Sequence, residues 1–365
     1  MKIGLVRRGF SPTGGAEAYL KRLGRALVDA GHRPRLYCTR EWPAAEWPHG
    51  PVTTLAHGGP LAFAHELQER ACPEEVLFSL ERVLACDCYR AGDGIHAGWL
   101  ELRRPHEPSW RHQLRRFNRK HTETVRLEQS LLGQRRALHV IANSELVKRQ
   151  IVDAYAYPAD QVTVVYNGLP DFHFQKRPGT RRELRNRWNI RENELALLFA
   201  GSGWFRKGLR YAIRALQQLK DPRVRLLVAG AGRKPRFAPP QVRFLGAVTE
   251  MESLYRAADL FVLPTIYDPF SNACLEALSF GLPVVTTAAN GVAEVMQPGV
   301  HGEVVTNAAD VPRLASALAA WLDPARREQA EAACIALARN FSMDRNLQQT
   351  LSVLQRVQPP AMRPP

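Results

Sequence analysis

The feature that most constrains the fold is a short apolar strand followed by a glycine-containing loop and an amphipathic helix, and it occurs twice. The first copy joins Ile3–Val6 to a helix predicted from Ala16 to Ala30. The second joins Leu195–Ala200 to a helix predicted over Leu209–Leu219. Such units open doubly wound α/β domains, in which parallel strands alternate with crossover helices. The repetition predicts two Rossmann-like domains, each with a parallel sheet.

Length and the remaining pattern support this organisation. One hydrophobic core rarely serves a chain of 365 residues. We expect a first domain over residues 1–170 and a second over 171–340, joined by a linker rich in Gly, Pro and basic residues that begins at Asn167. Residues 341–357 are expected to form a helix that packs back on the first domain, and 358–365 to be disordered. Further strands are predicted at Arg35–Cys38, His139–Ala142, Val162–Tyr166, Arg225–Ala229, Val242–Phe244, Leu260–Pro264 and Pro283–Thr287.

The formal net charge of +15 predicts an anionic partner, which could be nucleic acid, a membrane surface or a phosphorylated ligand. Ten Lys/Arg stand against four Asp/Glu between Glu101 and Ala137, which indicates either a solvated helix face or a surface for an anion. Within it, Trp110, Leu114 and Phe117 recur at helical spacing. The region Trp110–Arg126 therefore predicts a basic amphipathic helix on an anionic membrane surface, although the same stripe could pack on the first domain.

Other classes of protein fit less well. Only Trp110 and Phe117 accompany the basic residues, and no nucleic-acid-binding motif is present, so nucleic acid is not an expected partner. No apolar run is long enough to cross a membrane, and Arg7 and Arg8 occupy the place of a signal peptide's apolar region. Six cysteines lack zinc-type spacing. We expect reduced thiols in the cytoplasm and no metal site.

The loop after the second domain's first strand is a candidate phosphate site. Gly201-Ser202-Gly203-Trp204-Phe205-Arg206-Lys207-Gly208 lies between a predicted strand and a predicted helix, where open α/β sheets bind ligands. Arg206 offers a fork of donors and Lys207 a point charge, which together suit a diphosphate. The competing interpretation is that both are surface charges on a turn.

A second candidate lies between Tyr267 and Ala277, after the strand predicted at Leu260–Pro264. A helix is predicted from Asn272 to Phe280, and the unpaired N–H groups of its first turn favour phosphate or a polarised sugar oxygen. Asp268 and Glu276 flank this helix start, and carboxylates beside a phosphate site suit the hydroxyls of ribose and hexose. Alternatively, Asp268 caps the helix and Glu276 is an exposed helix residue.

The first domain offers Asp93 and His96, in the stretch Asp87-Cys88-Tyr89-Arg90-Ala91-Gly92-Asp93-Gly94-Ile95-His96. Their small neighbours would let a substrate approach closely. They form the candidate reaction centre, or else Asp93 makes a turn and His96 is a packed surface ring.

Taken together, the motifs resemble those of the retaining family 4 glycosyltransferases, which have the two-domain GT-B fold, over nearly the whole chain. The matching stretches are Gly14-Gly15-Ala16-Glu17, Asn143-Ser144, Val165-Tyr166-Asn167-Gly168, Gly201–Gly208, Ala257-Ala258-Asp259 and Asp268–Pro283. The family's Glu-x7-Glu motif appears as Asp268-x7-Glu276. Within the family the sequence is most similar to the lipopolysaccharide core glucosyltransferase I group, through Gly201–Gly208 and Asp87-x-Tyr89-x-Ala91-x-Asp93.

The resemblance implies a GT-B fold whose two Rossmann-like domains face each other across a cleft, and it implies roles for the candidates. Arg206 and Lys207 would hold the diphosphate, Glu276 the ribose hydroxyls, and Asp268, one methylene shorter than the usual Glu, the donor sugar. The family's cleft histidine would be His96, whereas Asp93 matches the lipopolysaccharide group. Backbone groups of the donor site would come from Phe270, Ser271, Asn272, Ala273, Gly14 and Gly15.

We therefore predict a retaining, metal-independent glycosyltransferase without a cofactor, which moves a hexose from a nucleotide-diphosphate sugar, favouring UDP-glucose, to a lipopolysaccharide core or other anionic glycolipid. It would lie on the cytoplasmic face of the inner membrane. The alternatives are an inactive sugar-nucleotide-binding protein, or a family 4 transferase with another donor that acts on another polysaccharide or glycolipid. A glycosidase is disfavoured, because the two carboxylates accompany Arg206, Lys207 and an anion-binding helix start, which a hydrolase does not need.

Overall fold

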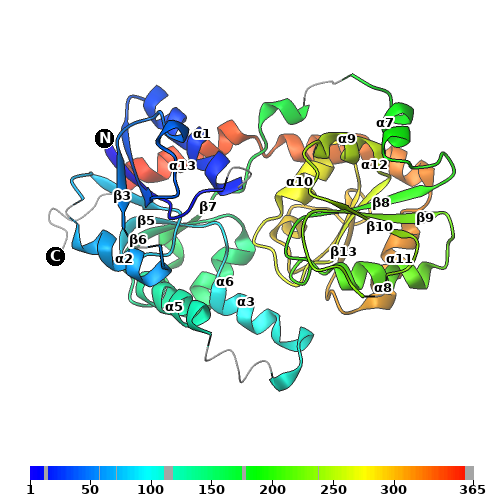
Figure 1. The fold of residues 1–365 in the computed structure, drawn as a ribbon, viewed down its shortest axis with the longest axis horizontal. Helices are drawn as coiled ribbons and strands as arrows, with labels where there is room; N and C mark the ends of the chain where they lie inside the picture. Colours follow the sequence, from blue (N-terminus) through cyan, green and yellow to red (C-terminus); the bar gives the residue numbers. More distant parts are fainter. Residues whose placement is uncertain are drawn as a thin grey trace. The chain divides into compact units, whose positions relative to one another are not determined.

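The computed structural model describes residues 1–11, 15–56, 58–70, 72–110, 118–174, 178–236 and 238–357. They divide into two units, the first from Met1–Tyr166 with Arg345–Pro365 and the second from Asn167–Asp344 (Figure 1). The boundaries expected at 170 and 340 thus fall at 166 and 344. The tail at 358–365, expected to be disordered, lies outside the described residues.

The first unit contains a seven-stranded sheet in the order β3-β2-β1-β4-β5-β6-β7, with every described pair parallel. The strands are β1 (Lys2–Val6), β2 (Arg33–Thr39), β3 (Val52–Leu55), β4 (Val76–Ser79), β5 (Cys86–Ala91), β6 (Ala137–Ala142) and β7 (Val162–Val164). Central strands of a parallel sheet are covered on both faces, and β1 and β5 are accordingly buried along almost their whole length.

Helices cover both faces of this sheet (Figure 1). The first face carries α1 (Gly15–Asp29) and α13 (Met343–Arg356), where the Tyr19 and Thr350 hydroxyls lie 3.3 Å apart. The second carries α2 (Pro60–Glu69), α5 (Arg119–Glu128) with the π-helical turn Gln129–Gly133, and α6 (Glu145–Tyr155). The apolar cluster on this face includes Phe63, Leu127 and Ile151. The short helix α3 (His96–Leu102) follows β5.

The second unit contains a six-stranded sheet in the order β10-β9-β8-β11-β12-β13, again with parallel pairs. Its strands are β8 (Leu195–Ala200), β9 (Val224–Ala229), β10 (Val242–Gly246), β11 (Leu260–Leu263), β12 (Val284–Thr287) and β13 (Gly302–Val305). Its helices are α7 (Arg181–Arg187), α8 (Leu209–Leu219), α9 (Met251–Ala257), α10 (Asn272–Ser279), α11 (Val311–Ala320) and α12 (Pro324–Arg339). Two parallel-sheet units of this kind confirm the predicted fold class.

The sequence pattern missed several elements. The strands β3, β4, β5 and β13 were not predicted, and the stretch predicted as a linker contains the 3-10 turn Asp171–Phe174 and the start of α7. Strand β5 was missed because Asp87 and Arg90 are charged, yet both are buried in it. Asp87 Oδ2 accepts a hydrogen bond of 2.6 Å from the backbone N–H of Leu77, so this carboxylate belongs to the sheet.

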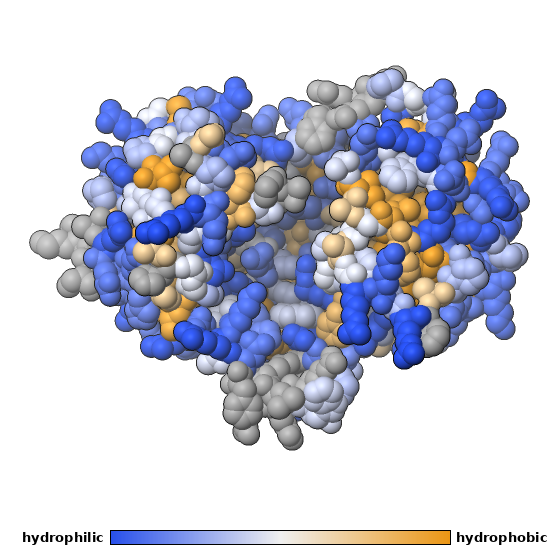
Figure 2. All heavy atoms as spheres, in the orientation of Figure 1, coloured by the Kyte–Doolittle hydropathy of each residue, from blue (hydrophilic) through white to orange (hydrophobic). Residues whose placement is uncertain are grey.

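The strand order locates the ligand-binding edge of each sheet. In the second unit the order reverses between β8 and β11, and in the first between β1 and β4. Open α/β sheets bind ligands outside the carboxyl ends of the strands at such a reversal. The loops that follow β8 and β11 carry the donor-site candidates. Figure 2 shows hydrophilic side chains over most of the visible face of each unit.

Candidate functional site

The loop between β8 and α8 is held in a conformation that only glycine accepts at its last position. Gly208 has φ +77°, and a Cβ there would meet the Pro264 carbonyl oxygen at 1.8 Å. This close approach brings the loop against the end of β11. Trp204 Nε1 donates to the Gly201 carbonyl at 3.0 Å, which closes the loop on itself. The loop therefore presents Arg206 and Lys207 at the sheet reversal.

Arg206 and Lys207 both face Asp268, which follows β11. The Lys207 ammonium pairs with Asp268 Oδ2, and Arg206 Nη1 lies 3.6 Å from the same oxygen. Arg206 Nη1 also donates to the Tyr267 carbonyl at 2.9 Å. The side chains of Lys207 and Asp268 are only 12% and 7% exposed. The structure thus brings three of the predicted site residues together, with two cations around one carboxylate.

The backbone around Asp268 is fixed by the loop that follows β12. The Asp268 N–H donates to the Ala289 carbonyl at 2.9 Å, and the Gly291 N–H donates to the Asp268 carbonyl at 2.9 Å. Asn290 Oδ1 accepts from the Ser271 N–H at 3.2 Å. Buried backbone groups with these partners hold the carboxylate in place before any ligand binds.

Helix α10 begins beside this cluster. Ser271 is its N-cap, and its side chain accepts a hydrogen bond from the Cys274 N–H at 3.4 Å. The first turn of a helix carries N–H groups without intrahelical partners, and here they belong to Asn272 and Ala273. Asn272 is exposed and Ser271 is buried. Phe270, also in the predicted set, is buried and its ring packs 5.9 Å from that of Phe341.

Glu276 lies one turn into α10 and is half-buried rather than exposed. Tyr255 of α9 donates a hydrogen bond from its hydroxyl to Glu276 Oε2 at 2.8 Å, and its ring stacks on Phe280 at 5.5 Å. Burial raises the pKa of Glu276, while the Tyr255 hydrogen bond and the charge of Lys207 act in the opposite direction. Sequence reasoning missed Tyr255, because nothing in its local pattern distinguishes it from a core tyrosine.

In the first unit, Asp93 and His96 lie beyond the carboxyl end of β5. Asp93 is exposed in a turn, and His96 is half-buried at the first residue of α3. His96 Nε2 is 2.9 Å from His121 Nδ1, and the two rings stack at 5.0 Å. Sequence reasoning missed His121, which lies 25 residues further along the chain. Burial, followed by the charge of Arg82, lowers the pKa of His96 to about 4.

The start of α3 is held by Glu128, a buried carboxylate that the sequence analysis did not identify. Glu128 accepts hydrogen bonds from the backbone N–H groups of His96 at 2.5 Å and Ala97 at 3.1 Å. Arg82 Nε donates to it at 2.8 Å and the Tyr155 hydroxyl at 3.1 Å. Arg82 also donates to the Gly94 carbonyl at 2.7 Å, so this pair fixes the loop that presents His96.

Of the two glycines predicted to approach the donor, only Gly15 is among the described residues. Gly14 lies outside the described residues, and Gly15 is the first residue of α1. At the carboxyl end of β1, Arg7 pairs with Glu17 at 3.0 Å and with Glu81 at 2.8 Å. These pairs tie the first turn of α1 to the carboxyl ends of β1 and β4.

Part of the predicted membrane segment Trp110–Arg126 lies outside the described residues. Residues 111–117 fall outside the described residues, among them Leu114 and Phe117. Trp110 is 56% exposed, and Arg119 pairs with Glu123 at 2.6 Å at the start of α5. None of the described helices is both long enough and apolar enough to cross a membrane.

Comparison with known proteins agrees with this geometry. A model described as Glycosyltransferase Family 4 matches residues 13–171, and one described as Glycosyl transferases group 1 matches residues 194–323. Together they match most of both units. The chain belongs to the family 4 glycosyltransferases.

Two sequence relatives extend the comparison. An uncharacterized glycosyltransferase of Methanocaldococcus jannaschii is 30% identical to this glycosyltransferase over 177 residues, 45% of this chain and 45% of that protein. The match thus spans less than half of that relative. A D-inositol 3-phosphate glycosyltransferase of Thermobispora bispora is 27% identical, over 92% of this chain and 88% of its own.

Solved structures share the fold of this glycosyltransferase. WaaG, a glycosyltransferase involved in lipopolysaccharide biosynthesis, has a TM-score of 0.81 at 20% identity, covering 97% of this chain and 100% of its own. HepE from Anabaena in complex with UDP-glucose has a TM-score of 0.73 at 21% identity, covering 97% and 99%. At these identities the likeness is one of fold.

Proposed function

We propose that this glycosyltransferase moves a hexose from UDP-glucose to the core of a lipopolysaccharide or to another anionic glycolipid, with retention of the anomeric configuration. The proposed donor rests on one observation: Lys207 and Arg206 converge on Asp268 beside the start of α10. This arrangement combines two cations and a helix N-terminus, which suit a diphosphate, with a carboxylate, which suits sugar hydroxyls.

The donor would be divided among these groups. On this proposal, Arg206 and Lys207 hold the two phosphates, and Asp268 accepts hydrogen bonds from hydroxyls of the hexose. Glu276 accepts the ribose hydroxyls, with its carboxylate oriented by Tyr255 at 2.8 Å. The structure of HepE with UDP-glucose, a relative in fold, favours this donor among the nucleotide sugars.

The reaction is a displacement at the anomeric carbon. The acceptor hydroxyl oxygen forms a bond to that carbon on the face from which the phosphate leaves, and the bond between the carbon and the phosphate oxygen breaks. The hydroxyl proton passes to the departing phosphate, so the products are the glycoside and UDP. The residues of the chain then align the reactants and stabilise the developing negative charge on the diphosphate, which is the role of Lys207 and Arg206. No metal ion or cofactor enters this scheme.

On the acceptor side, Asp93 and His96 are the proposed reaction-centre residues. A pKa of about 4 makes His96 neutral at physiological pH, so it would orient a hydroxyl by hydrogen bonding. Its Nε2 faces His121, which leaves Nδ1 as the atom for this contact. Asp93 is exposed, and its carboxylate would accept a hydrogen bond from the acceptor hydroxyl.

The positive net charge of the chain supports an anionic acceptor and an anionic membrane surface as partners. The net charge of +15 favours a phosphate-bearing glycolipid over a neutral one. Similarity in fold to WaaG supports lipopolysaccharide as the acceptor class. The segment Trp110–Arg126 would dock reversibly on the cytoplasmic face of the inner membrane, since each Lys or Arg near anionic lipids contributes about 1 kcal/mol.

The relation to the D-inositol 3-phosphate glycosyltransferase favours one alternative, a smaller phosphorylated acceptor with a different donor. An inactive sugar-nucleotide-binding protein is the other. A thermal-shift panel of sugar nucleotides, followed by the mass of the product formed with phosphorylated glycolipids, separates all three. UDP-glucose should give the largest shift, and the product should gain one hexose. A shift without a product would identify the inactive binder, and a preference for another nucleotide would refute the UDP assignment.

A further inference from the structure

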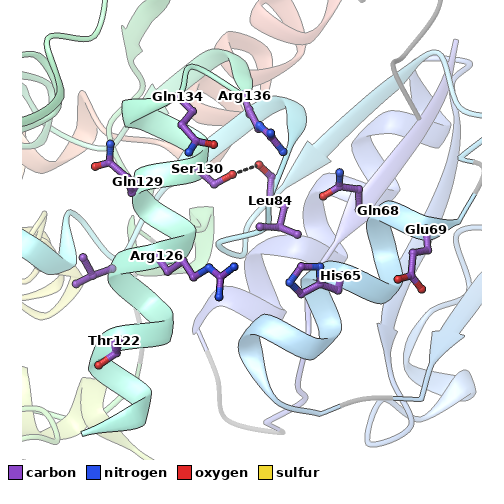
Figure 3. A pocket seen from close by; sticks show the side chains of 11 residues that line it. His65, Gln68, Glu69, Leu84, Thr122, Arg126, Gln129, Ser130, Gln134 and Arg136 are labelled. Carbon is purple, nitrogen blue, oxygen red and sulfur yellow. Dashed lines mark hydrogen bonds between the residues drawn. The ribbon is translucent and has the colours of Figure 1, made fainter. Parts of the chain in front are cut away.

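A groove of about 800 Å³ runs over the first unit between α2 and α5 (Figure 3). Leu84 and Val125 contribute apolar surface to it. The Ser130 hydroxyl donates to the Leu84 carbonyl at 2.8 Å, so the loop before β5 is tied to the turn that follows α5. The groove is therefore built on fixed backbone. Its lining residues lie outside the proposed donor site and reaction centre, and Thr122, Val125 and Arg126 also belong to the segment proposed to dock on the membrane.

The groove holds two arginines whose charges are not neutralised. Arg126 extends from α5 toward His65 on α2, and Arg136 extends into the same space from just before β6 (Figure 3). Across the described ranges, neither guanidinium has an ion pair or a side-chain hydrogen bond, whereas the neighbouring Arg82 and Arg119 both pair with glutamates. Guanidinium forks match phosphate oxygens, and two of them beside an imidazole favour an anionic ligand.

The other polar groups of the groove point to a sugar. Gln68, Gln129 and Gln134 line it, and Figure 3 shows the Gln129 carboxamide on the side of α5 that faces away from α2. A carboxamide carries both a donor and an acceptor, as a sugar hydroxyl does, so the two hydrogen-bond in pairs. The carboxylate of Glu69 adds an acceptor for hydroxyls on the same wall. Arginine cations together with carboxamides are complementary to a ligand that carries both phosphate and several hydroxyls.

The second unit offers an instructive contrast. A groove of about 880 Å³ there is lined by four arginines, and three of them lie in ion pairs with Asp259 or Glu252. Arg181 contacts Asp259 at 2.7 Å and Arg256 contacts Glu252 at 3.7 Å, and both arginines also donate to backbone carbonyls. These contacts engage the arginines within the second unit itself. The groove between α2 and α5 differs because its cations are available.

The position of the groove links it to the proposed reaction centre. Thr122, at one end of the lining, directly follows His121, which lies 2.9 Å from His96. From His121 to Arg126 the helix rises roughly 7.5 Å, at about 1.5 Å per residue. A phosphate bound at Arg126 would therefore lie within the reach of a short oligosaccharide from His96.

We propose that this groove binds a phosphorylated saccharide of the acceptor, with its phosphate on Arg126 and Arg136 and its hydroxyls on Gln68 and Gln134. The inference rests on the proposed function in taking the acceptor as a phosphate-bearing glycan. It adds a second anion site, separate from the donor diphosphate site of the second unit.

The test compares two double variants that change the charge equally. Arg126→Gln/Arg136→Gln removes both cations of the groove, and Arg33→Gln/Arg149→Gln removes two exposed cations of the same unit outside it. Calorimetry of the full chain with glucose 6-phosphate should show binding that is weakened about tenfold or more in the groove variant, since charged hydrogen bonds are lost. The control variant should bind like the parent.

Three outcomes would overturn the proposal. They are unchanged binding in the groove variant, an equal loss in the control variant, and equal affinity of the parent for inorganic phosphate and glucose 6-phosphate. The first would place the binding outside the groove, the second would leave only the net charge, and the last would remove the saccharide from the ligand. Unphosphorylated glucose should bind too weakly to measure.

Vesicles separate a glycolipid from a general membrane contact. The parent should sediment more with vesicles that carry a phosphorylated glycolipid than with phosphatidylglycerol vesicles, and the groove variant should lose only that preference. Loss of sedimentation with both kinds of vesicle would overturn the specific site. UDP affinity, measured in each variant, should stay at the parent value. A parent that binds glucose 6-phosphate but no UDP would refute the proposed donor and leave the groove assignment standing.

Discussion

Replacing Lys207 by methionine keeps the length of the side chain and removes its charge. In the structure this ammonium group pairs with Asp268, and the two side chains are 12% and 7% exposed. Arg206 remains 3.6 Å from the same carboxylate oxygen, but its side chain is 36% exposed and water screens its charge. The variant therefore loses the better-buried of the two cations proposed to meet the diphosphate.

The expected loss follows from the burial of Lys207. A hydrogen bond to a charged group contributes about 1.5–3 kcal/mol. The loss of one such bond corresponds to UDP binding that is about 10- to 150-fold weaker. Low exposure of Lys207 places its effect toward the upper end of this range, and the greater exposure of Arg206 places Arg206→Ala toward the lower end.

Calorimetric titration with UDP and with uridine measures this effect directly. Uridine lacks the diphosphate, so its affinity should not change, and an unchanged circular dichroism spectrum controls for the fold. The double variant Lys207→Met/Asp268→Asn also removes the carboxylate that would repel phosphate, and it should recover part of the loss. Equal UDP affinity in Lys207→Met and the parent, or an equal loss for uridine, would refute the diphosphate assignment. Full recovery in the double variant would mean that Lys207 acts only by neutralising Asp268.

Further predictions concern the remaining site residues. Glu276→Gln should weaken both UDP and uridine, because both carry ribose, whereas Asp268→Asn should weaken UDP-glucose relative to UDP; identical behaviour in titrations would refute this division. Asp93→Ala should lower turnover more than His96→Ala does while sparing donor binding, and the reverse order in initial rates would favour His96. Because its pKa of about 4 lies below the ordinary value, His96 binds its proton more readily in the unfolded chain, so the free energy of unfolding should fall by up to roughly 3 kcal/mol as pH drops from about 6.5 to 4. His96→Gln should remove that part of the pH dependence in urea unfolding, and an unchanged profile would contradict the assignment. Charge reversal of the basic segment to glutamate should abolish sedimentation with anionic vesicles and spare UDP binding, and salt-independent binding of the parent would argue against docking. The reversed residues are Arg111, Arg115, Arg116 and Arg119.

Local pattern was sufficient for the frame of each unit. The apolar run of β8 and the amphipathic α8 were predicted with the bounds that the structure has. A buried strand and a helix with one buried face each produce a characteristic spacing of apolar residues along the chain. The start of α10 was likewise predicted at Asn272, and the structure shows that Ser271, not Asp268, caps it. Edge strands such as β3, of four residues, carry too short a pattern for this reasoning.

The contacts inside the sites were decided by tertiary structure. Glu128 contacts His96 at the start of α3, 32 residues away in sequence, and Arg82 contacts Glu128 across 46 residues. Tyr255 contacts Glu276 across 21 residues. The sequence identified Glu276 and His96 by their motifs, but it could not supply these partners, because a buried charge is compatible with the fold only when the crossovers of the sheet bring its partner alongside. Sequence thus determined which loops follow which strands. The parallel sheet alone decided which loops meet, since its strand order departs from chain order and brings the ends of β8 and β11 side by side.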